Sequence, residues 1–350
     1  MISNEYYSQD IHGPFELYDI GDFDLEQGGT IPNCKLAYNT LGNLNSAKDN
    51  AILVTTWYSG TTKIMEQIYI GEDHALDPQK HFIILINQIG SGLSSSPHNS
   101  PAPYGMSNFP DVRIGDDVRA QHKLITEKFG IEKLALVFGA SMGGQQVWEW
   151  AVRYPDMVQR IAPIAITAKN TPHAFIFADT LNEALISDPN WNGGNYKASS
   201  DVKVGLFRQA RLWAVMGLNP EFYRQEYWRN MNFSSAEDFI SGFLEAYYEP
   251  LDPNNLLCMA WKWQRGDASR NTGGNLQEAL GRIRTKTLVM GFTGDMFVPQ
   301  TDLEFEQKMI ANSELRMIDT ICGHFALFAL EPEYMPQIDK NLEDLLSSSV

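Results

Sequence analysis

Residues 133–155, KLALVFGASMGGQQVWEWAVRYP, decide the fold class of this chain. The segment begins with an apolar run that is typical of a buried β-strand and continues as an amphipathic helix that ends near Pro155. Between the two lies the stretch 139–143, GASMG, which matches the pattern G-x-S-x-G at a strand-to-helix turn. Small residues on either side of the serine permit a sharp turn that exposes its Oγ above the sheet. Ser141 is therefore the candidate nucleophile.

The predicted helix after Ser141 agrees with this interpretation. Its first turn places the positive end of the helix dipole and the backbone N–H of Met142 where an oxyanion would develop. Glu149 and Arg153 are spaced i,i+4 and are expected to form an ion pair. An ordinary glycine-rich turn between a strand and a helix is the alternative. The assignment therefore depends on finding a base and an acid elsewhere in the chain.

Apolar runs and amphipathic helices alternate on both sides of this segment. Strands are predicted at 15–23, 34–42, 51–57, 81–89, 133–141, 158–167, 285–292 and 314–319, and helices at 115–129, 142–155, 302–310 and 332–346. This alternation predicts an α/β fold with a mostly parallel sheet that is flanked by helices. Residues 168–280 lack clear strands and carry five of the eight tryptophans. We therefore predict an α/β core of residues 1–167 and 281–350 that is interrupted by a helical lid of residues 168–280.

The composition excludes several functional classes. The chain has 350 residues, 43% of them hydrophobic, and a formal net charge of −16, which argues against nucleic-acid and anionic-membrane partners. Three scattered cysteines favour neither a disulfide framework nor a zinc site. No apolar stretch reaches the ~18–20 residues that span a bilayer, and the N-terminal residues do not resemble a signal peptide. We expect a cytoplasmic protein that acts on a small molecule and binds no metal.

Two histidines follow Ser141 in the chain and are candidates for the base. His324 follows a late predicted strand, where the base of a serine nucleophile at such a turn is expected. His173 begins the predicted lid and precedes every candidate acid. The sequence therefore favours His324, although a loop histidine with only structural hydrogen bonds is the alternative.

The acid is expected after the preceding predicted strand, 285–292. Asp295 is the first carboxylate there, and Gly294 permits a sharp turn before it. Asp302 is the competitor, but its position indicates the start of a helix, which it would cap. Asp295 is thus the predicted partner that holds the tautomer of the histidine.

The second oxyanion donor is expected in the loop that follows the strand at 51–57. The backbone N–H of Tyr58 is the first choice and that of Trp57 is the alternative. The ring of Tyr58 would also line the acyl pocket.

A glycine-containing loop at 88–96, QIGSGLSSS, resembles the start of a dinucleotide-binding fingerprint. It lacks the third glycine, and Pro97 interrupts the helix that should begin there, so NAD binding is not expected. The chain also lacks the sequence motifs of zinc hydrolases and P-loop proteins. We therefore expect no cofactor.

Over nearly its whole length the chain resembles the homoserine O-acetyltransferase branch of the α/β-hydrolase superfamily. The resemblance rests on the opening FELYDIGDFDLEQGGTIPNCKLAYNTLGNLN, on GASMGGQQVWEWAVRYPDMV, on SDPNWNGGNY and GLFRQAR in the predicted lid, and on the late Gly-Asp and Gly-His loops. It implies an α/β-hydrolase fold with a Ser141–Asp295–His324 triad, a helical lid over a deep tunnel and an acetyl-enzyme intermediate. It also implies a homodimer formed through the lids.

Departures from the family pattern bear on the substrate. Members that act on homoserine commonly carry an aspartate directly after the histidine, where this chain has Phe325, and an apolar ring cannot pair with a substrate ammonium. The family's H-A-L-T-G reads TWYSG at 56–60. Arg211 matches an arginine that the family pattern associates with a substrate carboxylate, although it could equally be a structural arginine of the lid. In these features the chain is most similar to the family's short-chain acetate esterases.

Three functional hypotheses follow. The first is an esterase that hydrolyses short acetyl esters through an acyl-Ser141 intermediate, with water activated by His324 and with Trp57, Phe325 and Arg211 as candidate substrate contacts. The second is an O-acetyltransferase that uses acetyl-CoA as co-substrate and acylates homoserine or another alcohol. The third is a non-catalytic binding protein on the same fold, which the complete apparent triad disfavours.

Overall fold

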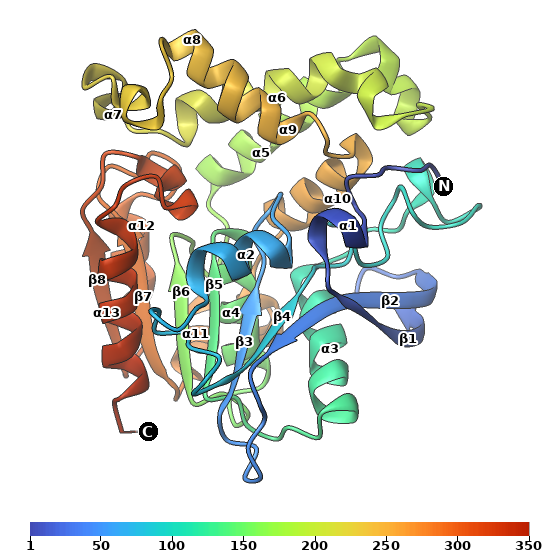
Figure 1. Cartoon of the computed structure of the whole chain (residues 1–350). Helices are drawn as coiled ribbons and strands as arrows, with labels where there is room; N and C mark the ends of the chain where they lie inside the picture. The colour runs from blue at the N-terminus through green and yellow to red at the C-terminus, as the bar shows by residue number, and fades with distance from the viewer. Residues whose placement is uncertain (350) are drawn as a thin grey trace.

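The apolar runs of the sequence become the strands of one eight-stranded sheet in the computed structural model, which describes residues 1–349 (Figure 1). The strands are β1 (Glu16–Asp24), β2 (Thr30–Leu41), β3 (Ala51–Thr55), β4 (Phe82–Ile86), β5 (Leu136–Ala140), β6 (Arg160–Ile164), β7 (Lys286–Phe292) and β8 (Ser313–Ile318). Their order across the sheet is β1-β2-β4-β3-β5-β6-β7-β8. β2 pairs antiparallel with β1 and β4, and all other neighbours pair in parallel. The predicted α/β fold class with a mostly parallel sheet is confirmed.

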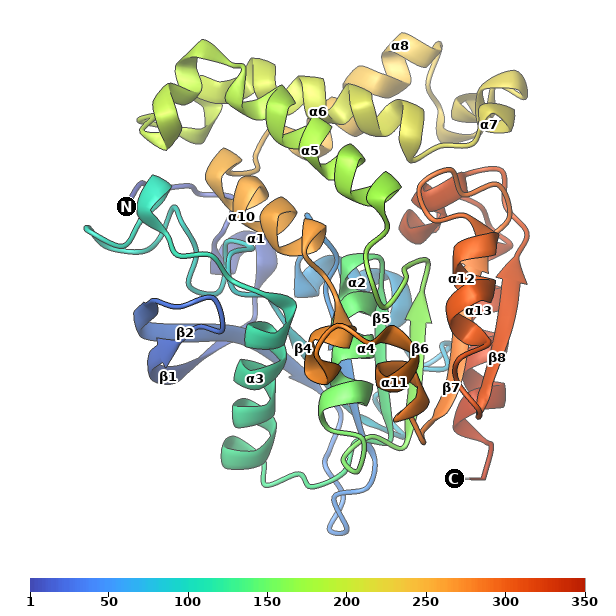
Figure 2. The ribbon, with the colours of Figure 1, turned by 180° about the vertical axis from the view of Figure 1, so that it is seen from behind.

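Helices cover both faces of the sheet and one of its edges. They are α1 (Gln9–His12), α2 (Thr62–Tyr69), α3 (Ile114–Lys123), α4 (Met142–Arg153), α5 (Pro172–Ile186), α6 (Lys203–Met216), α7 (Pro220–Arg224), α8 (Ala236–Phe239), α9 (Ala246–Tyr248), α10 (Pro253–Gln264), α11 (Leu276–Gly281), α12 (Gln300–Gln307) and α13 (Tyr334–Leu346). Figure 1 shows α2 and α13 in front of the strands, and Figure 2 shows α3, α4 and α11 on the opposite face. Within residues 1–349, no helix has the length and apolar character needed to cross a bilayer.

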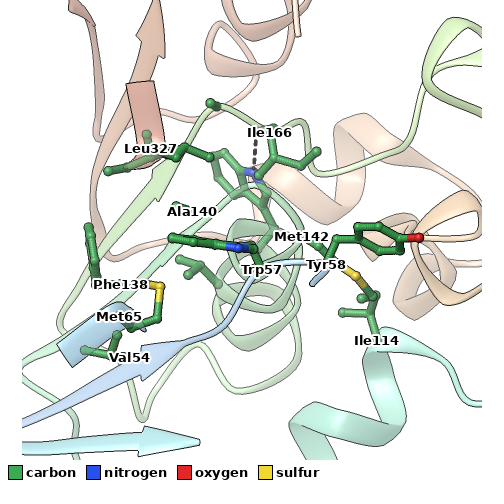
Figure 3. Close-up of a cluster of buried hydrophobic side chains, with 14 of the residues drawn as sticks. Val54, Trp57, Tyr58, Met65, Ile114, Phe138, Ala140, Met142, Ile166 and Leu327 are labelled. Atoms are coloured by element: carbon green, nitrogen blue, oxygen red, sulfur yellow. Dashed lines mark hydrogen bonds between the residues drawn. The ribbon is translucent and has the colours of Figure 1, made fainter. Parts of the chain in front are cut away.

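The core lies between the sheet and these two helical layers. Every residue of β3, β4, β5 and β6 is buried, as expected for parallel strands that are covered on both faces. In Figure 3, Val54 and Phe138 lie with Met65 of α2, while Met142 and Ile114 lie together on the other side of the cluster. Each large apolar side chain that is fully buried in this way contributes roughly 1.5–3 kcal/mol to stability.

The segment between β6 and β7 forms a helical cap. Helices α5 to α10 lie across the edge at which the parallel strands end (Figures 1 and 2). The chain then returns beside α4, where a short 3-10 helix at Ala268–Thr272 packs against α4 and α11. Within the predicted lid of residues 168–280, the part that covers the strand ends is therefore 172–264.

The segment that leaves the sheet for the cap and the segment that returns from it are hydrogen-bonded to each other. The N–H of Ala268 donates to the carbonyl of Ala168 at 3.0 Å, and the N–H of Asn170 donates to the carbonyl of Gly266 at 2.8 Å. The outgoing and returning segments thus form a short ladder that fixes the cap at its base.

A buried carboxylate at this base is expected to make stability depend on pH. Glu306 of α12 accepts the N–H groups of Ala168 and Lys169 at 2.5 and 3.0 Å, and burial raises its pKa to about 7. In the unfolded chain the pKa of a glutamate is about 4.3, so this proton is released at a lower pH than in the folded protein. Between those pH values the folded state holds more protons, so this contribution to stability falls as pH rises.

We expect Glu306→Gln to remove this pH-dependent contribution. The free energy of unfolding of the wild type relative to the variant should fall by about 1–3 kcal/mol between pH 5 and pH 8. Urea unfolding of both proteins at the two pH values measures it. A stability difference that is the same at both pH values would contradict the assignment to Glu306.

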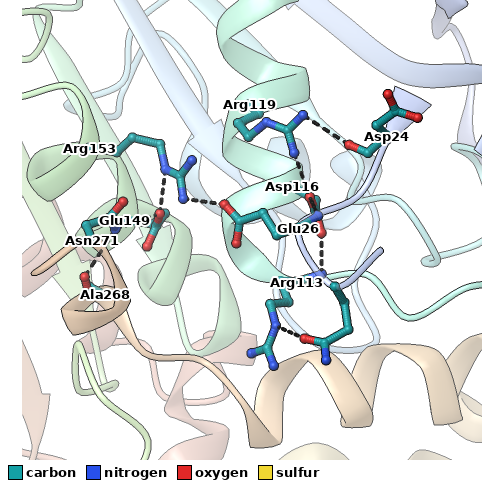
Figure 4. A network of polar contacts seen from close by, with 10 residues as sticks. Asp24, Glu26, Arg113, Asp116, Arg119, Glu149, Arg153, Ala268 and Asn271 are labelled. Carbon is teal, nitrogen blue, oxygen red and sulfur yellow. Dashed lines mark hydrogen bonds and ion pairs between the residues drawn. The ribbon is translucent and has the colours of Figure 1, made fainter. Parts of the chain in front are cut away.

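A polar network joins the β1–β2 turn to α3 and α4 (Figure 4). Arg153 donates to Glu149 at 2.7 Å and also to Glu26, so the i,i+4 ion pair predicted from the sequence is confirmed. Asp116 at the start of α3 accepts the N–H of Glu26 at 2.9 Å. Asn271 donates to Glu149 at 2.9 Å and so ties the returning segment to the same network.

Candidate active site

Ser141 lies at the turn between β5 and α4, in a backbone conformation that few side chains adopt. Its φ is 51° and its ψ is −130°, a combination that costs free energy and that the surrounding structure must impose. Crowding explains the small residues beside it. A Cβ on Gly139 would lie 2.1 Å from Oγ1 of Thr55, and a Cβ on Gly143 would lie 2.9 Å from the carbonyl oxygen of Thr55. The pattern G-x-S-x-G is thus a steric requirement of this turn.

Ser141, His324 and Asp295 form one chain of hydrogen bonds. Nδ1 of His324 lies 2.8 Å from Oδ2 of Asp295, and Nε2 lies 2.9 Å from Oγ of Ser141. A carboxylate only accepts, so Nδ1 carries the ring proton and Nε2 accepts from the serine hydroxyl. The three residues follow the ends of β5, β8 and β7, which lie at the same edge of the sheet.

Further contacts fix the orientation of the Asp295 carboxylate and the His324 ring. Oδ1 of Asp295 accepts the backbone N–H groups of Phe297 and Val298 at 2.8 and 3.0 Å. The ring of His324 stacks on Trp213 with a centroid distance of 6.0 Å and meets the edge of Phe297 at 4.8 Å. The carboxylate and the imidazole are therefore held in one geometry before any substrate binds.

The two competing residues from the sequence lie elsewhere. His173 is exposed in the first turn of α5. Asp302 lies in the first turn of α12, whose N-cap residue is Pro299. Neither residue lines the pocket described below.

Three backbone N–H groups near Ser141 have no acceptor. Within residues 1–349, the N–H groups of Met142, Tyr58 and Trp57 donate to no carbonyl or side chain, although all three residues are buried. The first N–H groups of a helix have no acceptor within the helix, so the N–H of Met142 can donate to an acceptor placed beside Ser141, as can those of Trp57 and Tyr58. Figure 3 shows Trp57 and Tyr58 beside Met142. Both candidates for the second oxyanion donor are thus available.

Ser141 and His324 open onto a small apolar pocket beneath the cap. Its volume is about 30 Å³, so it admits only a few non-hydrogen atoms. Its lining consists of Trp57, Tyr58, Ser59, Ser141, Trp213, Phe243, Leu244, Tyr247, Tyr248, His324, Phe325, Leu327 and Phe328. Within residues 1–349 this lining contains no Asp, Glu, Lys or Arg, which favours a small uncharged substrate.

The predicted substrate contacts divide into two groups. Trp57, Tyr58 and Phe325 line the pocket. Arg211 does not line it; its Nη2 pairs with Oε1 of Glu245 at 2.8 Å, and 60% of its side chain is exposed. The phenol of Tyr58 lies 3.3 Å from Oε1 of Gln209, and burial raises the pKa of Tyr58 above its ordinary value.

Phe325 forms an apolar wall directly after His324. Its ring lies 5.6 Å from that of Trp213 and 5.3 Å from that of Phe328. A Cβ on Gly217 would come within 2.7 Å of it, so the ring is closely packed. A substrate ammonium placed here would have no charged partner.

The sequence did not identify the pocket residues that the cap supplies. Trp213 on α6, with Tyr247 and Tyr248 on α9, covers the site. Helical spacing from Leu206 through Ala210 indicates the buried face of α6 that carries Trp213. That pattern does not show which part of the core the face contacts.

Comparison with known proteins gives matches over nearly the whole chain. A family model described as the alpha/beta hydrolase fold matches residues 60–329. An ethyl acetate hydrolase from Pseudomonas veronii is 55% identical over 345 residues and covers 99% of each chain. The crystal structure of an acetylester hydrolase from Corynebacterium glutamicum is 54% identical, with a TM-score of 0.98, and covers 99% of this chain and 100% of that one. A homoserine O-acetyltransferase from Methanohalobium evestigatum is 35% identical and covers 86% of this chain and 67% of that one.

Proposed function

The chain belongs to the alpha/beta hydrolase fold family and is a carboxylic-ester hydrolase, and from that premise we propose that it hydrolyses acetate esters of small alcohols through an acetyl intermediate on Ser141. The observation that carries the proposal is the hydrogen-bond chain from Asp295 through His324 to Ser141 at a pocket of about 30 Å³. The resemblance to homoserine O-acetyltransferases, and more closely to acetate esterases, that we inferred from the sequence is confirmed by the relatives.

In the first half-reaction Ser141 attacks the acyl carbon. Nε2 of His324 takes the hydroxyl proton as the C–O bond forms, and Asp295 stabilises the resulting imidazolium. The N–H of Met142, with that of Tyr58 or Trp57, donates to the oxyanion. Collapse of the tetrahedral adduct breaks the ester bond, and the departing alkoxide takes the proton from His324 and leaves as the alcohol.

In the second half-reaction water replaces the alcohol. His324 removes a proton from the water that attacks the acetyl group on Ser141, and the same N–H groups hold the second oxyanion. Collapse returns the proton to Oγ and releases acetic acid, which loses its remaining proton to solvent and becomes acetate. These groups of the chain supply nucleophile, base and oxyanion donors, so we propose that the reaction needs no cofactor.

Transfer of the acetyl group to homoserine is the alternative, and the structure offers it less support. An amino-acid acceptor brings an ammonium and a carboxylate. The pocket beside Phe325 has no acidic partner for the ammonium, and Arg211 is paired with Glu245. We therefore propose water as the acceptor and do not propose Arg211 as a substrate contact.

Product analysis with a set of esters tests the proposal. The purified protein is supplied with ethyl acetate, ethyl butyrate and ethyl hexanoate, and separately with acetyl-CoA and homoserine. We expect the highest kcat/KM for ethyl acetate, because the pocket excludes longer chains. Formation of O-acetylhomoserine from acetyl-CoA without ester hydrolysis would show that the protein is a transferase and not an esterase.

We expect Phe325→Ala to widen the substrate range. Truncation of the ring enlarges the pocket beside His324, and each methylene that a pocket newly accepts is worth roughly 1–3 kcal/mol. The ratio of kcat/KM for ethyl hexanoate to that for ethyl acetate should therefore rise about 10-fold or more. Initial rates with the two esters measure this ratio.

Phe222→Ala is the matched control for that change. Phe222 is fully buried in the cap, among Tyr227 and Phe239, and does not line the pocket. Its variant loses a similar amount of packing but should keep the wild-type ratio. An unchanged ratio in Phe325→Ala, or an equal rise in Phe222→Ala, would show that Phe325 does not limit substrate size.

We also propose that the protein acts as a homodimer in the cytoplasm. Apolar side chains on the outer helices of the cap support the assembly, since Ile176 and Val215 are 65% and 68% exposed. Burial raises the pKa of the free thiol of Cys34 to about 12, and such unreactive free thiols suit a reducing compartment. Light scattering of the purified protein tests the assembly, and a monomer at micromolar concentration would contradict it.

A further inference from the structure

Two glutamine side chains fix the first peptide of the loop that follows β3. The carbonyl oxygen of Thr56 accepts from Nε2 of Gln88 at 2.6 Å and from Nε2 of Gln146 at 3.3 Å. In a trans peptide the C=O and the following N–H point in opposite directions. These bonds therefore also set the direction of the N–H of Trp57 and the course of the chain into Tyr58. Those two N–H groups are the candidate second donors to the oxyanion.

The amide of Gln88 is in turn oriented by a buried ion pair. Its Oε1 accepts from Nζ of Lys262 at 3.3 Å. Lys262 also donates to the carbonyl of Ile89 at 2.7 Å and pairs with Asp117 at 2.5 Å. A lysine only donates and a carbonyl oxygen only accepts, so the amide oxygen must face Lys262 and the NH₂ group must face Thr56. This contact pattern leaves the Gln88 amide one orientation.

The network joins parts of the chain that are distant in sequence. Lys262 lies on α10, which connects the cap to the core, and Asp117 lies on α3 (Figure 2). Gln88, Lys262 and Asp117 are all fully buried. A buried charge pair with complete hydrogen bonding holds its members in a narrow range of positions. The packing of α10 against the core is thereby linked to the loop that carries the candidate oxyanion donors.

On the basis of the proposed ester hydrolysis, we propose that Gln88 is a positioning residue for the oxyanion hole, with Lys262 and Asp117 fixing its amide. Gln88 touches neither Ser141 nor the pocket. It acts through the Thr56 peptide, whose orientation is set before the oxyanion forms. Loss of this preorganisation weakens stabilisation of the transition state and leaves ground-state binding nearly unchanged.

Gln88→Met is the variant that tests the proposal, because methionine has a similar length but no hydrogen-bonding amide. We expect kcat for ethyl acetate to fall about 10- to 100-fold, with KM changed less than about threefold. The second-order rate of phosphonylation of Ser141 by an alkyl p-nitrophenyl phosphonate should fall by a similar factor. Phosphonylation also develops negative charge on an oxygen in the oxyanion hole, and it needs no hydrolysis of the adduct.

Two further variants separate positioning from general damage. Gln88→Glu keeps an acceptor for Lys262 but, when ionised, removes the donor to Thr56, so it should be slow as well. Gln145→Met alters another buried glutamine, which precedes Gln146 in the sequence and whose Nε2 contacts the carbonyl of Trp263 at 3.5 Å and not that of Thr56. It should keep wild-type kcat and phosphonylation rates. Lys262 is not substituted, because without it the buried Asp117 carboxylate would have lost its charged partner.

The readouts distinguish this inference from the proposed function. Wild-type kcat and phosphonylation rates in Gln88→Met would overturn the positioning role, as would equal losses in Gln145→Met. A loss confined to KM would also overturn it. If the wild type hydrolyses no ester but is phosphonylated at Ser141, the esterase proposal fails. The ratio of phosphonylation rates between Gln88→Met and the wild type then still decides the role of Gln88.

Discussion

Ser141→Ala is expected to lower kcat for ethyl acetate by roughly 10⁴- to 10⁶-fold. Alanine has no oxygen to attack the acyl carbon, and within residues 1–349 Nε2 of His324 is hydrogen-bonded only to the hydroxyl of Ser141. Any remaining rate would come from the oxyanion donors acting on bound ester and water. The fold should be preserved, since Ser141 makes its side-chain hydrogen bond only to His324.

Ser96→Ala is the matched control for that variant. The hydroxyl of Ser96 is also buried, but it donates to the carbonyl of Ser94 at 2.7 Å and lies outside the pocket. Acetate release by the two variants and the wild type, at equal protein concentration, measures the effect. Retention of more than about 1% of wild-type turnover in Ser141→Ala would assign the nucleophile to another group.

Asp295→Asn is expected to lower kcat about 10³- to 10⁴-fold. Oδ1 of Asp295 accepts two backbone N–H groups, so the amide oxygen of the asparagine must take that place. Its NH₂ group then faces His324 and donates to Nδ1. The ring proton is forced onto Nε2, which can no longer accept from Ser141. The loss thus arises from the wrong tautomer in an otherwise unchanged site.

Asp302→Asn separates this effect from a simple change of charge. Asp302 was the other acidic candidate after β7, and it lies in the first turn of α12. Its variant should keep turnover within a few-fold of the wild type. Initial rates and thermal unfolding of both variants are the measurements. A small loss in Asp295→Asn beside a large loss in Asp302→Asn would move the acid role.

The three side chains of the hydrogen-bond chain could be placed from the sequence because each follows a strand of a parallel sheet. Strands such as β5 are continuous apolar runs, since both their faces are covered, and the carboxyl ends of parallel strands meet at one edge. Ser141 and Asp295 were chosen as chemically suitable residues just after such runs, whereas His324 follows β8, an edge strand that is only partly buried. The structure brings the three together within hydrogen-bond distance.

The wall of the pocket could not be placed in this way. The cap is built of helices with short loops, and no strand register fixes which helical face meets the core. Trp213 was therefore not among the predicted site residues, whereas it stacks on His324 and lines the pocket. Arg211 on the same helix matched a family pattern but lies outside the pocket lining. Helical periodicity identifies the buried face of a helix but not the part of the core that this face contacts.

The contacts that Gln88 makes with the loop of the candidate oxyanion donors could not be predicted from the sequence either. Gln88 lies just past an apolar run, in a loop that looked only like an incomplete dinucleotide-binding motif. Its partner Lys262 is 174 residues away in the chain. A polar side chain next to a buried strand signals that it needs partners, but the pattern does not say which groups of the folded chain supply them.

The release of acetate from ethyl acetate by the wild-type protein, with no added alcohol and no CoA, shows whether water accepts the acetyl group from Ser141. If water accepts the acetyl group from Ser141, each protein molecule will release many equivalents of acetate at a steady rate. A single equivalent of ethanol, with acetyl retained on the protein and no further acetate, would contradict the proposed hydrolysis. It would show that water is excluded from the acetyl-enzyme and that another acceptor completes the reaction.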